Sequence, residues 1–249
     1  MNFSKHDIDK VASIIVNSKH LVVFTGAGIS TESGLSDYRG PDGVWTRRDK
    51  GLPPKRRTIQ SIEPNQGHYA LVELQNMGLL KFVISQNVDN LHLASGIKPE
   101  LISELHGNGQ LLKCINCDTR FSFSDIGWNR KIHGNGYRTD KPLSNQPKCP
   151  KCQGRIISSV INFNDPMPEK EMEQATFQSS QCDCMFVIGS TLKVYPASAF
   201  PEEAKANGAI LIILNIGETG LDYLADILLE AKAGEFLSAL LDRIKELKK

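Results

Sequence analysis

The hydrophobic positions of this chain fall into two patterns, short continuous runs and longer stretches with helical spacing. The continuous runs, each followed by glycine or polar residues, predict buried strands at 21–24, 82–84, 185–188 and 210–214. Apolar residues three and four positions apart predict helices that begin after Ser4 and cover 66–77, 201–207 and 235–248. Strands that alternate with helices predict a doubly wound, parallel α/β sheet of the Rossmann-like class.

The stretch between residues 114 and 152 interrupts this alternation. It is rich in Gly, Pro, Asn and Lys and poor in aliphatic residues, so it cannot build a hydrophobic core of its own. Two Cys-x-x-Cys pairs bound it, and each pair can direct two thiolates at one ion. Two disulfides or a redox pair are the alternatives, but duplicated pairs in a reducing compartment favour one structural zinc ion. The four expected ligands are Cys114, Cys117, Cys149 and Cys152.

This interruption divides the chain into two expected parts. Residues 1–110 and 156–249 are predicted to form a nucleotide-binding, Rossmann-like domain, with an inserted zinc-binding module at 111–155. Part of the segment 40–80 is expected to supply a cofactor loop and helices of the smaller domain.

Composition narrows the class of protein without naming a function. Hydrophobic residues make up 40% and charged residues 23%, which is ordinary for a soluble globular protein. No apolar run approaches the roughly 18 residues that a membrane span requires, and the polar start lacks the apolar region of a signal peptide. These features predict a cytoplasmic protein that does not enter the membrane.

The net charge of +1 gives no general reason to expect nucleic acid as a partner. One local cluster is basic, and we interpret it as a solvated surface, with an acidic partner or nucleic acid as the minor alternative. The cluster comprises Arg47, Arg48, Lys50, Lys55, Arg56 and Arg57.

A glycine loop directly after the first predicted strand indicates a nucleotide site. Gly26 and Gly28 stand where glycine lets the backbone approach a phosphate group, although any tight turn can also use them. The third position of the dinucleotide fingerprint is Thr31, and the second strand lacks an acidic residue at its end, so an ordinary dehydrogenase fits poorly. Ser190 and Asn215, at the ends of later strands, can take part in nucleotide binding.

Amide, carboxylate and imidazole side chains crowd together after the strand at 82–84. Open α/β sheets place their chemistry beyond the carboxyl ends of the strands, so these side chains predict a catalytic site. They belong to Gln86, Asn87, Asp89 and, after the next short stretch, His106.

Together these motifs closely resemble the sirtuin family over essentially the whole chain. The matching segments are GAGIS at 26–30, ESGLSDYRG at 32–40, QNVD at 86–89, LHG at 105–107, the two Cys pairs, GSTLKVYPA at 189–197 and Asn215. Gly40 to Trp45 (GPDGVW) and Ser103 to Asn108 (SELHGN) resemble the branch that holds nuclear, chromatin-linked sirtuins. The resemblance implies an enzyme that uses NAD to remove acyl groups from lysine, transfers them to ADP-ribose and releases nicotinamide.

The resemblance also implies a role for individual residues. His106 is expected to be the general base, with Asn87 orienting ribose or water. In the family's route the acyl oxygen attacks the ribose C1′ and nicotinamide leaves, after which a base with a pKa near neutrality activates a ribose hydroxyl. Gln86 resembles the contact to the nicotinamide ribose, and Val88 and Asp89 resemble the nicotinamide pocket. The other expected NAD contacts are Gly26, Ala27, Gly28, Thr31, Asp37, Tyr38, Arg39, Gly189, Ser190 and Asn215.

The sequence departs from the family where an acyl-lysine peptide would add as a strand. Asn164 and Asp165 replace the family's Gly-Glu pair, whereas Phe163 is retained and can line an apolar acyl tunnel. Three alternatives stay open: a preference for long acyl chains, an NAD hydrolase or mono-ADP-ribosyltransferase, and a non-catalytic zinc and nucleotide module. The presence of His106 with Asn87 and Asp89 argues against the last alternative, because binding alone needs no base.

Overall fold

The computed structural model describes residues 3–40, 42–53 and 62–249. Its main sheet has six parallel strands in the spatial order β3-β2-β1-β7-β8-β9. Numbered along the chain within this sheet, the order is 3-2-1-4-5-6, which is the order of dinucleotide-binding folds. The predicted doubly wound sheet is therefore confirmed. The strands are β1 (Leu21–Thr25), β2 (Leu80–Ser85), β3 (Ile102–Glu104), β7 (Cys184–Ile188), β8 (Ile210–Leu214) and β9 (Ile227–Leu229).

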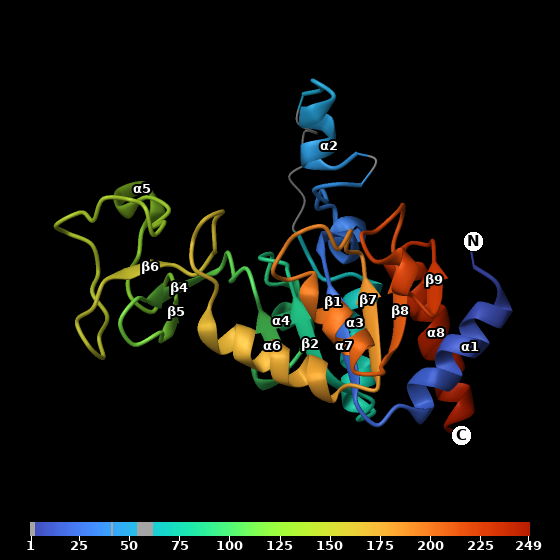
Figure 1. Cartoon of the computed structure of the whole chain (residues 1–249). Coiled ribbons are helices and arrows are strands. Elements are labelled where there is room, and N and C mark those ends of the chain that lie inside the picture. The colour runs from blue at the N-terminus through green and yellow to red at the C-terminus, as the bar shows by residue number, and fades with distance from the viewer. Residues whose placement is uncertain (1–2, 41, 54–61) are drawn as a thin grey trace.

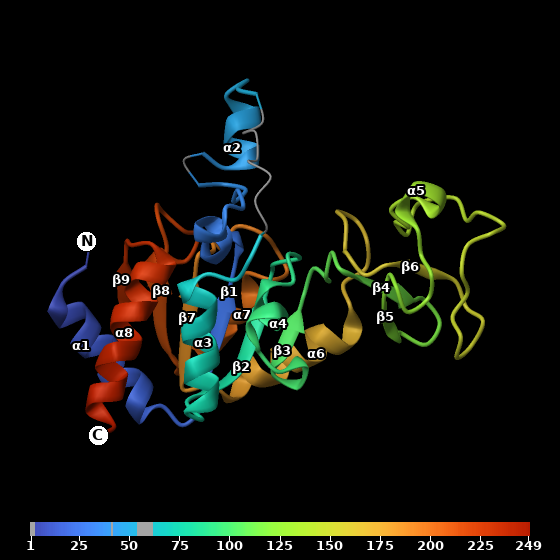
Figure 2. The same ribbon diagram turned by 180° about the vertical axis from the view of Figure 1, so that it is seen from behind.

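Helices cover both faces of this sheet. The helices α6 (Glu169–Gln181) and α7 (Ala199–Ala206) lie in front of the sheet in Figure 1, and α3 (Gln66–Asn76) and α8 (Ala233–Leu247) lie in front of it in Figure 2. The helix α1 (Lys5–Asn17) packs against α8 on the second face. Neighbouring side chains of β1 enter opposite cores, Val23 on the α3 and α8 side and Val22 on the α6 and α7 side. Burial on both faces explains why each of these strands is a continuous apolar run.

The helix ends follow the signals in the sequence. The hydroxyl oxygen of Ser4 accepts the Asp7 N–H, and the Asp7 carboxylate accepts the Ser4 N–H at 2.8 Å, which closes a capping box at the start of α1. Gly78 follows the C-cap of α3 with a φ of 70°, the left-handed conformation that glycine adopts without strain. Among the described residues no helix combines the length and the apolarity needed to cross a lipid bilayer.

A second, smaller sheet stands to one side of the main one (Figure 1). Its three antiparallel strands are β4 (Leu111–Cys114), β5 (Arg120–Ser122) and β6 (Ile156–Ser158), and β6 extends this sheet beyond the predicted boundary at residue 155. Its buried cluster contains only five residues, two of which are cysteines: Leu112, Cys114, Trp128, Cys149 and Ile156. So small a core needs a further source of stability.

Six shorter elements complete the described fold, among them the 3-10 helices η2 (Pro99–Leu101) and η3 (Asp222–Leu224). The helix α2 (Val44–Asp49) projects above the main sheet, and α4 (Leu91–Ser95) follows β2. The helix α5 (Arg130–His133) belongs to the segment around the small sheet. A 3-10 helix, η1 (Ala27–Ser33), follows β1 directly. Residues 54–61, between α2 and α3 in the sequence, lie outside the described part of the chain.

Candidate active site

The glycine loop is shaped by contact with a second loop of the sheet. Gly28 donates its N–H to the carbonyl of Gly189 at 2.8 Å, and a Cβ on Gly28 would lie 2.6 Å from the Cα of Gly189. A Cβ on Gly26 would lie 2.7 Å from the Gly189 carbonyl oxygen. These glycines therefore allow the loops after β1 and β7 to touch backbone to backbone. From the sequence, Gly26 and Gly28 were expected to let the backbone approach a phosphate group. The structure adds a second reason for glycine at both positions, the close packing of the two loops.

A cavity of about 930 Å³ opens where these two loops meet. Strands β1 and β7 flank the point at which the strand order reverses, the usual place for a ligand in an open α/β sheet. All but one of the residues expected to bind NAD or to catalyse line this cavity. The exception is Thr31, an exposed residue whose hydroxyl donates to the Gly28 carbonyl at 2.9 Å.

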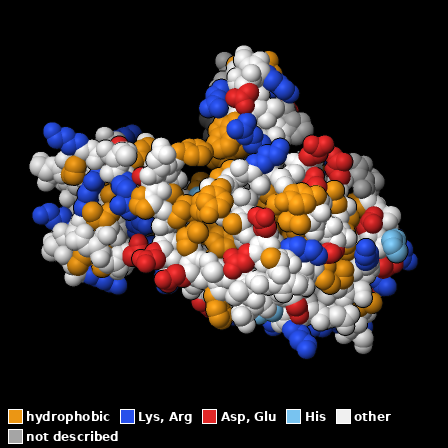
Figure 3. Space-filling view, viewed as in Figure 1, with side chains coloured by type: hydrophobic (Ala, Val, Ile, Leu, Met, Phe, Trp, Pro, Cys, Tyr) orange, Lys and Arg blue, Asp and Glu red, His pale blue; other side chains and the backbone are white. Residues whose placement is uncertain are grey.

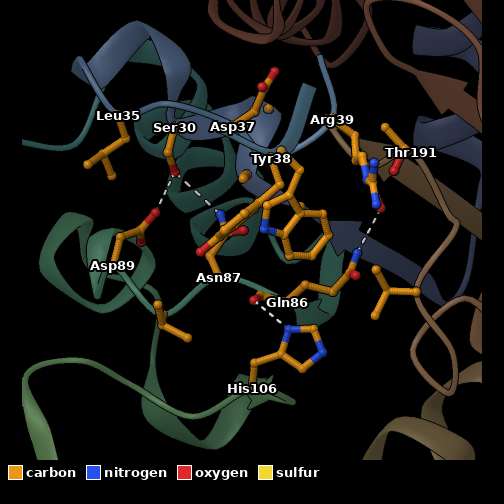
Figure 4. Close-up of a pocket in the computed structure, with 18 of the residues that line it drawn as sticks. Ser30, Leu35, Asp37, Tyr38, Arg39, Gln86, Asn87, Asp89, His106 and Thr191 are labelled. Atoms are coloured by element: carbon orange, nitrogen blue, oxygen red, sulfur yellow. Dashed lines mark hydrogen bonds between the residues drawn. The ribbon is translucent and has the colours of Figure 1, made fainter. Parts of the chain in front are cut away.

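His106 lies in the loop after β3 and enters the cavity beside the loop after β2 (Figure 4). Its Nδ1 is 2.9 Å from the main-chain carbonyl oxygen of Gln86. A carbonyl oxygen only accepts hydrogen bonds, so Nδ1 carries the proton and Nε2 is the basic nitrogen. Burial lowers the pKa of His106 below its ordinary value, and the bond to Gln86 offsets part of this shift. The imidazole is therefore neutral at pH 7, as a general base must be.

Ser30 joins the amide and carboxylate of the same site. Its hydroxyl donates to Asp89 Oδ2 at 2.6 Å and accepts from Asn87 Nδ2 at 3.3 Å, as Figure 4 shows. The other Asp89 oxygen accepts the Leu91 N–H at 2.9 Å. Ser30 was not among the predicted site residues, although its place directly after the glycine loop was a signal for it. The three side chains form one hydrogen-bonded unit opposite His106.

The other end of the cavity has polar groups from three strand ends. Gln86 Nε2 donates to Ser190 Oγ at 2.7 Å, which links the loops after β2 and β7. Asn215, after β8, donates its amide to the carbonyl of Gly217 at 2.9 Å. These residues place hydroxyl and amide groups where the hydroxyls of a dinucleotide can be bound.

The loop from Asp37 to Trp45 forms a wall of the cavity. The Asp37 carboxylate accepts the Gly40 N–H at 3.1 Å and so folds this loop upon itself. The Tyr38 and Trp45 rings lie 5.0 Å apart, and the Arg39 guanidinium lies 4.8 Å from the centre of the Trp45 ring. Arg39 also forms a half-exposed ion pair at 3.0 Å with Asp49, the last residue of α2, so it both lines the cavity and pairs with a carboxylate at the end of a helix.

Apolar side chains continue this wall toward the small sheet. The Phe163 ring lies 5.7 Å from the Trp45 ring and is 76% exposed, and Tyr195 is 81% exposed. Hydrophobic side chains gather where α2, the small sheet and the main sheet meet (Figure 3). Several lining residues were not predicted as site residues. Leu35 and Val194 lie inside segments that match the family, whereas Gln110 and Met167 join the cavity only through the fold.

A buried polar network supports the loop that leaves β2. The pKa of His92 is lowered by burial to about 3 and that of His68 to about 4, so both imidazoles are neutral. His92 Nε2 lies 2.9 Å from Thr25 Oγ1, which donates to Ser85 Oγ at 3.0 Å. Ser85 Oγ in turn accepts the Asn87 N–H at 3.1 Å. This network fixes the backbone at the point where the site loop begins.

The predicted metal ligands come together in the small sheet. The Sγ atoms of Cys114, Cys117, Cys149 and Cys152 all lie within 4.8 Å of one another. Two of the Sγ–Sγ distances are 3.4 and 3.7 Å. A tetrahedral zinc ion with four thiolates requires sulfur atoms about 3.8 Å apart, so this donor set fits one structural zinc ion. With four protein ligands the ion has no open position, and its role is to hold the small sheet together.

The basic cluster is only partly within the described residues. Arg47 pairs with Asp42 at 3.5 Å, and Arg48 pairs with Asp49 at 3.3 Å. Lys50 is exposed, and Lys55, Arg56 and Arg57 lie outside the described residues. The two described arginines of the cluster, Arg47 and Arg48, thus have acidic partners around α2.

The fold and the site together define an NAD-type nucleotide enzyme with a structural metal module. The model of the Sir2 family matches residues 52–196. The chain is 36% identical to NAD-dependent protein deacetylase 1 of Pyrobaculum aerophilum, over 98% of each chain. It is also 36% identical to NAD-dependent protein deacylase 2 of Archaeoglobus fulgidus, over 97% of this chain and 98% of that one. The chain therefore belongs to the Sir2, or sirtuin, family.

Solved structures of the family agree with this assignment. A Sir2 enzyme structure superposes with a TM-score of 0.75 at 34% identity and covers 98% of this chain and 100% of its own. The structure of Sir2Af2 bound to a myristoylated histone peptide superposes with a TM-score of 0.70 at 34% identity and covers 98% of this chain and 99% of its own. The resemblance inferred from the sequence motifs is thus confirmed.

Proposed function

We propose that this protein is an NAD-dependent protein-lysine deacylase that transfers the acyl group to ADP-ribose and releases nicotinamide. The observation that carries the proposal is a neutral His106 imidazole, held through Nδ1 by the Gln86 carbonyl, inside a cavity at the switch point of the sheet. Relatives that match nearly the whole chain are named as NAD-dependent protein deacetylases and deacylases. One solved relative is a Sir2 complex with a p53 peptide and NAD.

The residues of the cavity suit the parts of NAD. When bound, NAD supplies an electrophilic ribose carbon and nicotinamide as its leaving group. We assign Ser190 and Asn215 to the adenosine half of the cofactor and Gln86 to the nicotinamide ribose, following the order of the strand ends. Asp89 can accept the nicotinamide amide N–H, because a carboxylate has lone pairs beyond those used by Ser30 and Leu91.

His106 and Asn87 divide the proton transfer and orientation steps. The basic Nε2 of His106 removes a proton from a ribose hydroxyl, while Nδ1 stays bound to Gln86 and keeps the ring in place. Ser30 fixes the Asn87 amide, whose other atoms then orient ribose or water. Thr31 is exposed and does not line the cavity, and its contact with NAD stays a prediction from the motif.

The pH dependence of deacylation tests the role given to His106. Burial lowers the pKa of this base below the ordinary 6.5, so its active, neutral form is lost only when the pH falls below that value. We expect kcat/KM to be level near pH 7 and to fall on the acid side with a midpoint below 6.5. The measurement is a steady-state profile with a stability check at every pH. A midpoint above 6.5 would contradict an imidazole base in a desolvated site.

A product balance separates deacylation from the alternatives on the same fold. Purified protein is incubated with an acetylated histone peptide and NAD, and the products are quantified by mass spectrometry. We expect nicotinamide, deacylated peptide and acyl-ADP-ribose in equal amounts. Nicotinamide release at the same rate without peptide would instead support an NAD hydrolase, and a peptide that gains ADP-ribose would support a mono-ADP-ribosyltransferase.

The apolar wall of the cavity bears on which acyl chains the enzyme prefers. Phe163, Met167 and Val194 give the cavity surface suited to an apolar chain, and the relative Sir2Af2 binds a myristoylated peptide. These observations favour long acyl chains as a second candidate activity beside deacetylation. A panel of acetyl, octanoyl and myristoyl peptides, compared by kcat/KM, distinguishes the two.

The proposed function also implies a role for each part of the chain and a cellular location for the protein. We propose that residues 1–110 and 156–249 bind NAD and that 111–155 hold zinc, with part of the 40–80 segment as a cofactor loop and as helices of the smaller domain. The pairing of β6 with β4 supports moving the second boundary to Ser158. We also propose a cytoplasmic location, because a zinc site of four thiolates requires reduced cysteines.

A further inference from the structure

We propose that Arg120, on the small sheet, is a positioning residue for the two loops that carry Asp89 and His106. The inference rests on the proposed deacylase function and adds to it a link between the zinc-binding part and the catalytic loops. The link runs through hydrogen bonds that start at the Arg120 guanidinium. We call it the Arg120 network, and its members are Arg120, Glu104, Glu171, Asn108 and Asn90.

The first step crosses from the small sheet to the main one. Arg120 lies on β5, and its Nη1 donates to Glu104 Oε2 at 2.9 Å. Its Nη2 donates to the carboxylate of Glu171 on α6. The side chains of Glu104 and Glu171 are only 5% and 9% exposed. One planar guanidinium therefore holds two buried carboxylates from two elements of the main domain.

The second step reaches both catalytic loops. The other oxygen of Glu104 accepts from Asn108 Nδ2 at 2.7 Å, and the same Nδ2 donates to Asn90 Oδ1 at 2.8 Å. Asn108 is fully buried and lies two residues after His106. Asn90 directly follows Asp89 and has a φ of 70°, an unusual conformation for a residue other than glycine. The network thus ends on residues that flank the base and the nicotinamide pocket.

The charges show why the network depends on Arg120. Burial raises the pKa of Glu104, and the Arg120 guanidinium opposes that shift. Without the Arg120 cation, the buried carboxylates of Glu104 and Glu171 would lose their countercharge. A buried unpaired charge is strongly destabilising. The Glu104 side chain would then leave its position, and Asn108 would lose an acceptor. Both loops would lose a constraint while the zinc ligands stayed intact.

The position of Arg120 also connects this network to the metal. In the β4–β5 ladder the backbone of Arg120 is paired with that of Lys113, the residue before Cys114. Cys114 and Cys117 lie at the end of β4 and in the turn that leads to β5. A metal ion at the cysteines therefore fixes the strand from which Arg120 extends, although it has no open position for chemistry.

The adenosine end of the cavity should not depend on the network. Ser190 and Asn215 lie at the ends of β7 and β8, and the side chains of both form hydrogen bonds with described residues outside the Arg120 network. Loss of Arg120 should therefore lower kcat more than it raises KM for NAD. A residue that served stability alone would not separate the two constants in this way.

The test compares zinc-loaded variants of the full chain. We expect Arg120→Met to lower kcat for deacetylation about tenfold, to change KM for NAD less than about twofold, and to keep one zinc ion per chain. Arg120→Lys, which keeps the charge but not the planar fork, should recover part of kcat. Lys131→Met is the matched control, because Lys131 is an exposed cation of the same module and forms no ion pair with any described residue.

A second measurement keeps the proposal independent of the assay and of the proposed function. Hydrogen–deuterium exchange should speed up by about tenfold or more in 87–91 and 105–109 for Arg120→Met, and less for Arg120→Lys, relative to Lys131→Met. If the wild-type chain shows no deacylation, the proposed function is wrong. The exchange rates of the variants still show whether Arg120 holds the two loops in place. Unchanged exchange in both segments, or a kcat of Arg120→Met equal to that of Lys131→Met, would overturn the role of Arg120. If Arg120→Met does not fold, Arg120→Lys decides. Exchange and kcat of Arg120→Lys equal to those of Lys131→Met would then overturn the role of Arg120.

Discussion

We expect replacement of His106 by alanine to lower kcat for deacylation by about 10³-fold, the usual contribution of a positioned general base. The variant loses the only imidazole that lines the cavity, as far as the described residues extend. Binding should survive, because the adenosine contacts assigned to Ser190 and Asn215 come from other strands. The affinity for NAD should therefore change by less than about threefold, and zinc should stay at one ion per chain.

The experiment combines single-turnover deacylation with isothermal titration of NAD. His6→Ala serves as the control, since His6 is an exposed residue of α1 on the far side of the sheet from α6 and α7. A His106→Ala variant that keeps more than a tenth of wild-type kcat would assign the base to another group. A variant that no longer binds NAD would show that the imidazole contributes to binding rather than to proton transfer.

The second large effect should follow from removing one zinc ligand. We expect Cys149→Ser to lose the ion and to unfold the small sheet, because Cys149 is both a ligand and one of the five residues in its buried cluster. Structural zinc contributes about 10–16 kcal/mol in small zinc-binding peptides, far more than so small a core can supply. Deacylation should fall with it, since an unfolded β5 cannot hold Arg120 against Glu104.

Metal content by emission spectrometry and limited trypsin digestion together test this expectation. Cleavage within 111–158 should become at least about tenfold faster, while the main sheet stays resistant. Cys182→Ser is the control, because Cys182 lies outside the cluster and should leave the zinc content unchanged. A Cys149→Ser protein that retains one zinc ion and an intact small sheet would remove Cys149 from the ligand set.

The strands of the main sheet could be predicted where burial on both faces leaves a continuous apolar run. The runs at 21–24, 185–188 and 210–214 satisfy this condition, and each became a strand of the sheet. The helix α6 could not be found in this way, because its buried side chains are Glu171, Ala175 and Ser179. Its position depends on contacts with α7 and the small sheet rather than on an apolar stripe. The strands β3 and β9 have only three residues each, too few for a periodic signal.

The site residues could likewise be predicted only where a regular feature of the fold brings them together. Polar residues at strand ends were found because the parallel sheet brings those ends together, whatever the details of the loops. The tilted rings of Trp45 and Phe163 lie 5.7 Å apart although 118 positions of chain separate them, a contact that no local pattern predicts. Thr31 was expected among the NAD contacts from its place in the motif, but in the 3-10 turn at 27–33 it is exposed and does not line the cavity.

The pairing of β4 with β6 has a consequence for how this architecture can change. Leu112 and Ser158 are direct partners in that ladder, so the polypeptide leaves the large domain and returns to it through neighbouring positions. A segment with adjoining ends can be lengthened, shortened or exchanged without disturbing the strand order of the sheet that hosts it. Transplanting a relative's metal-binding insert onto this chain should therefore succeed structurally, provided that a guanidinium still reaches the paired carboxylates.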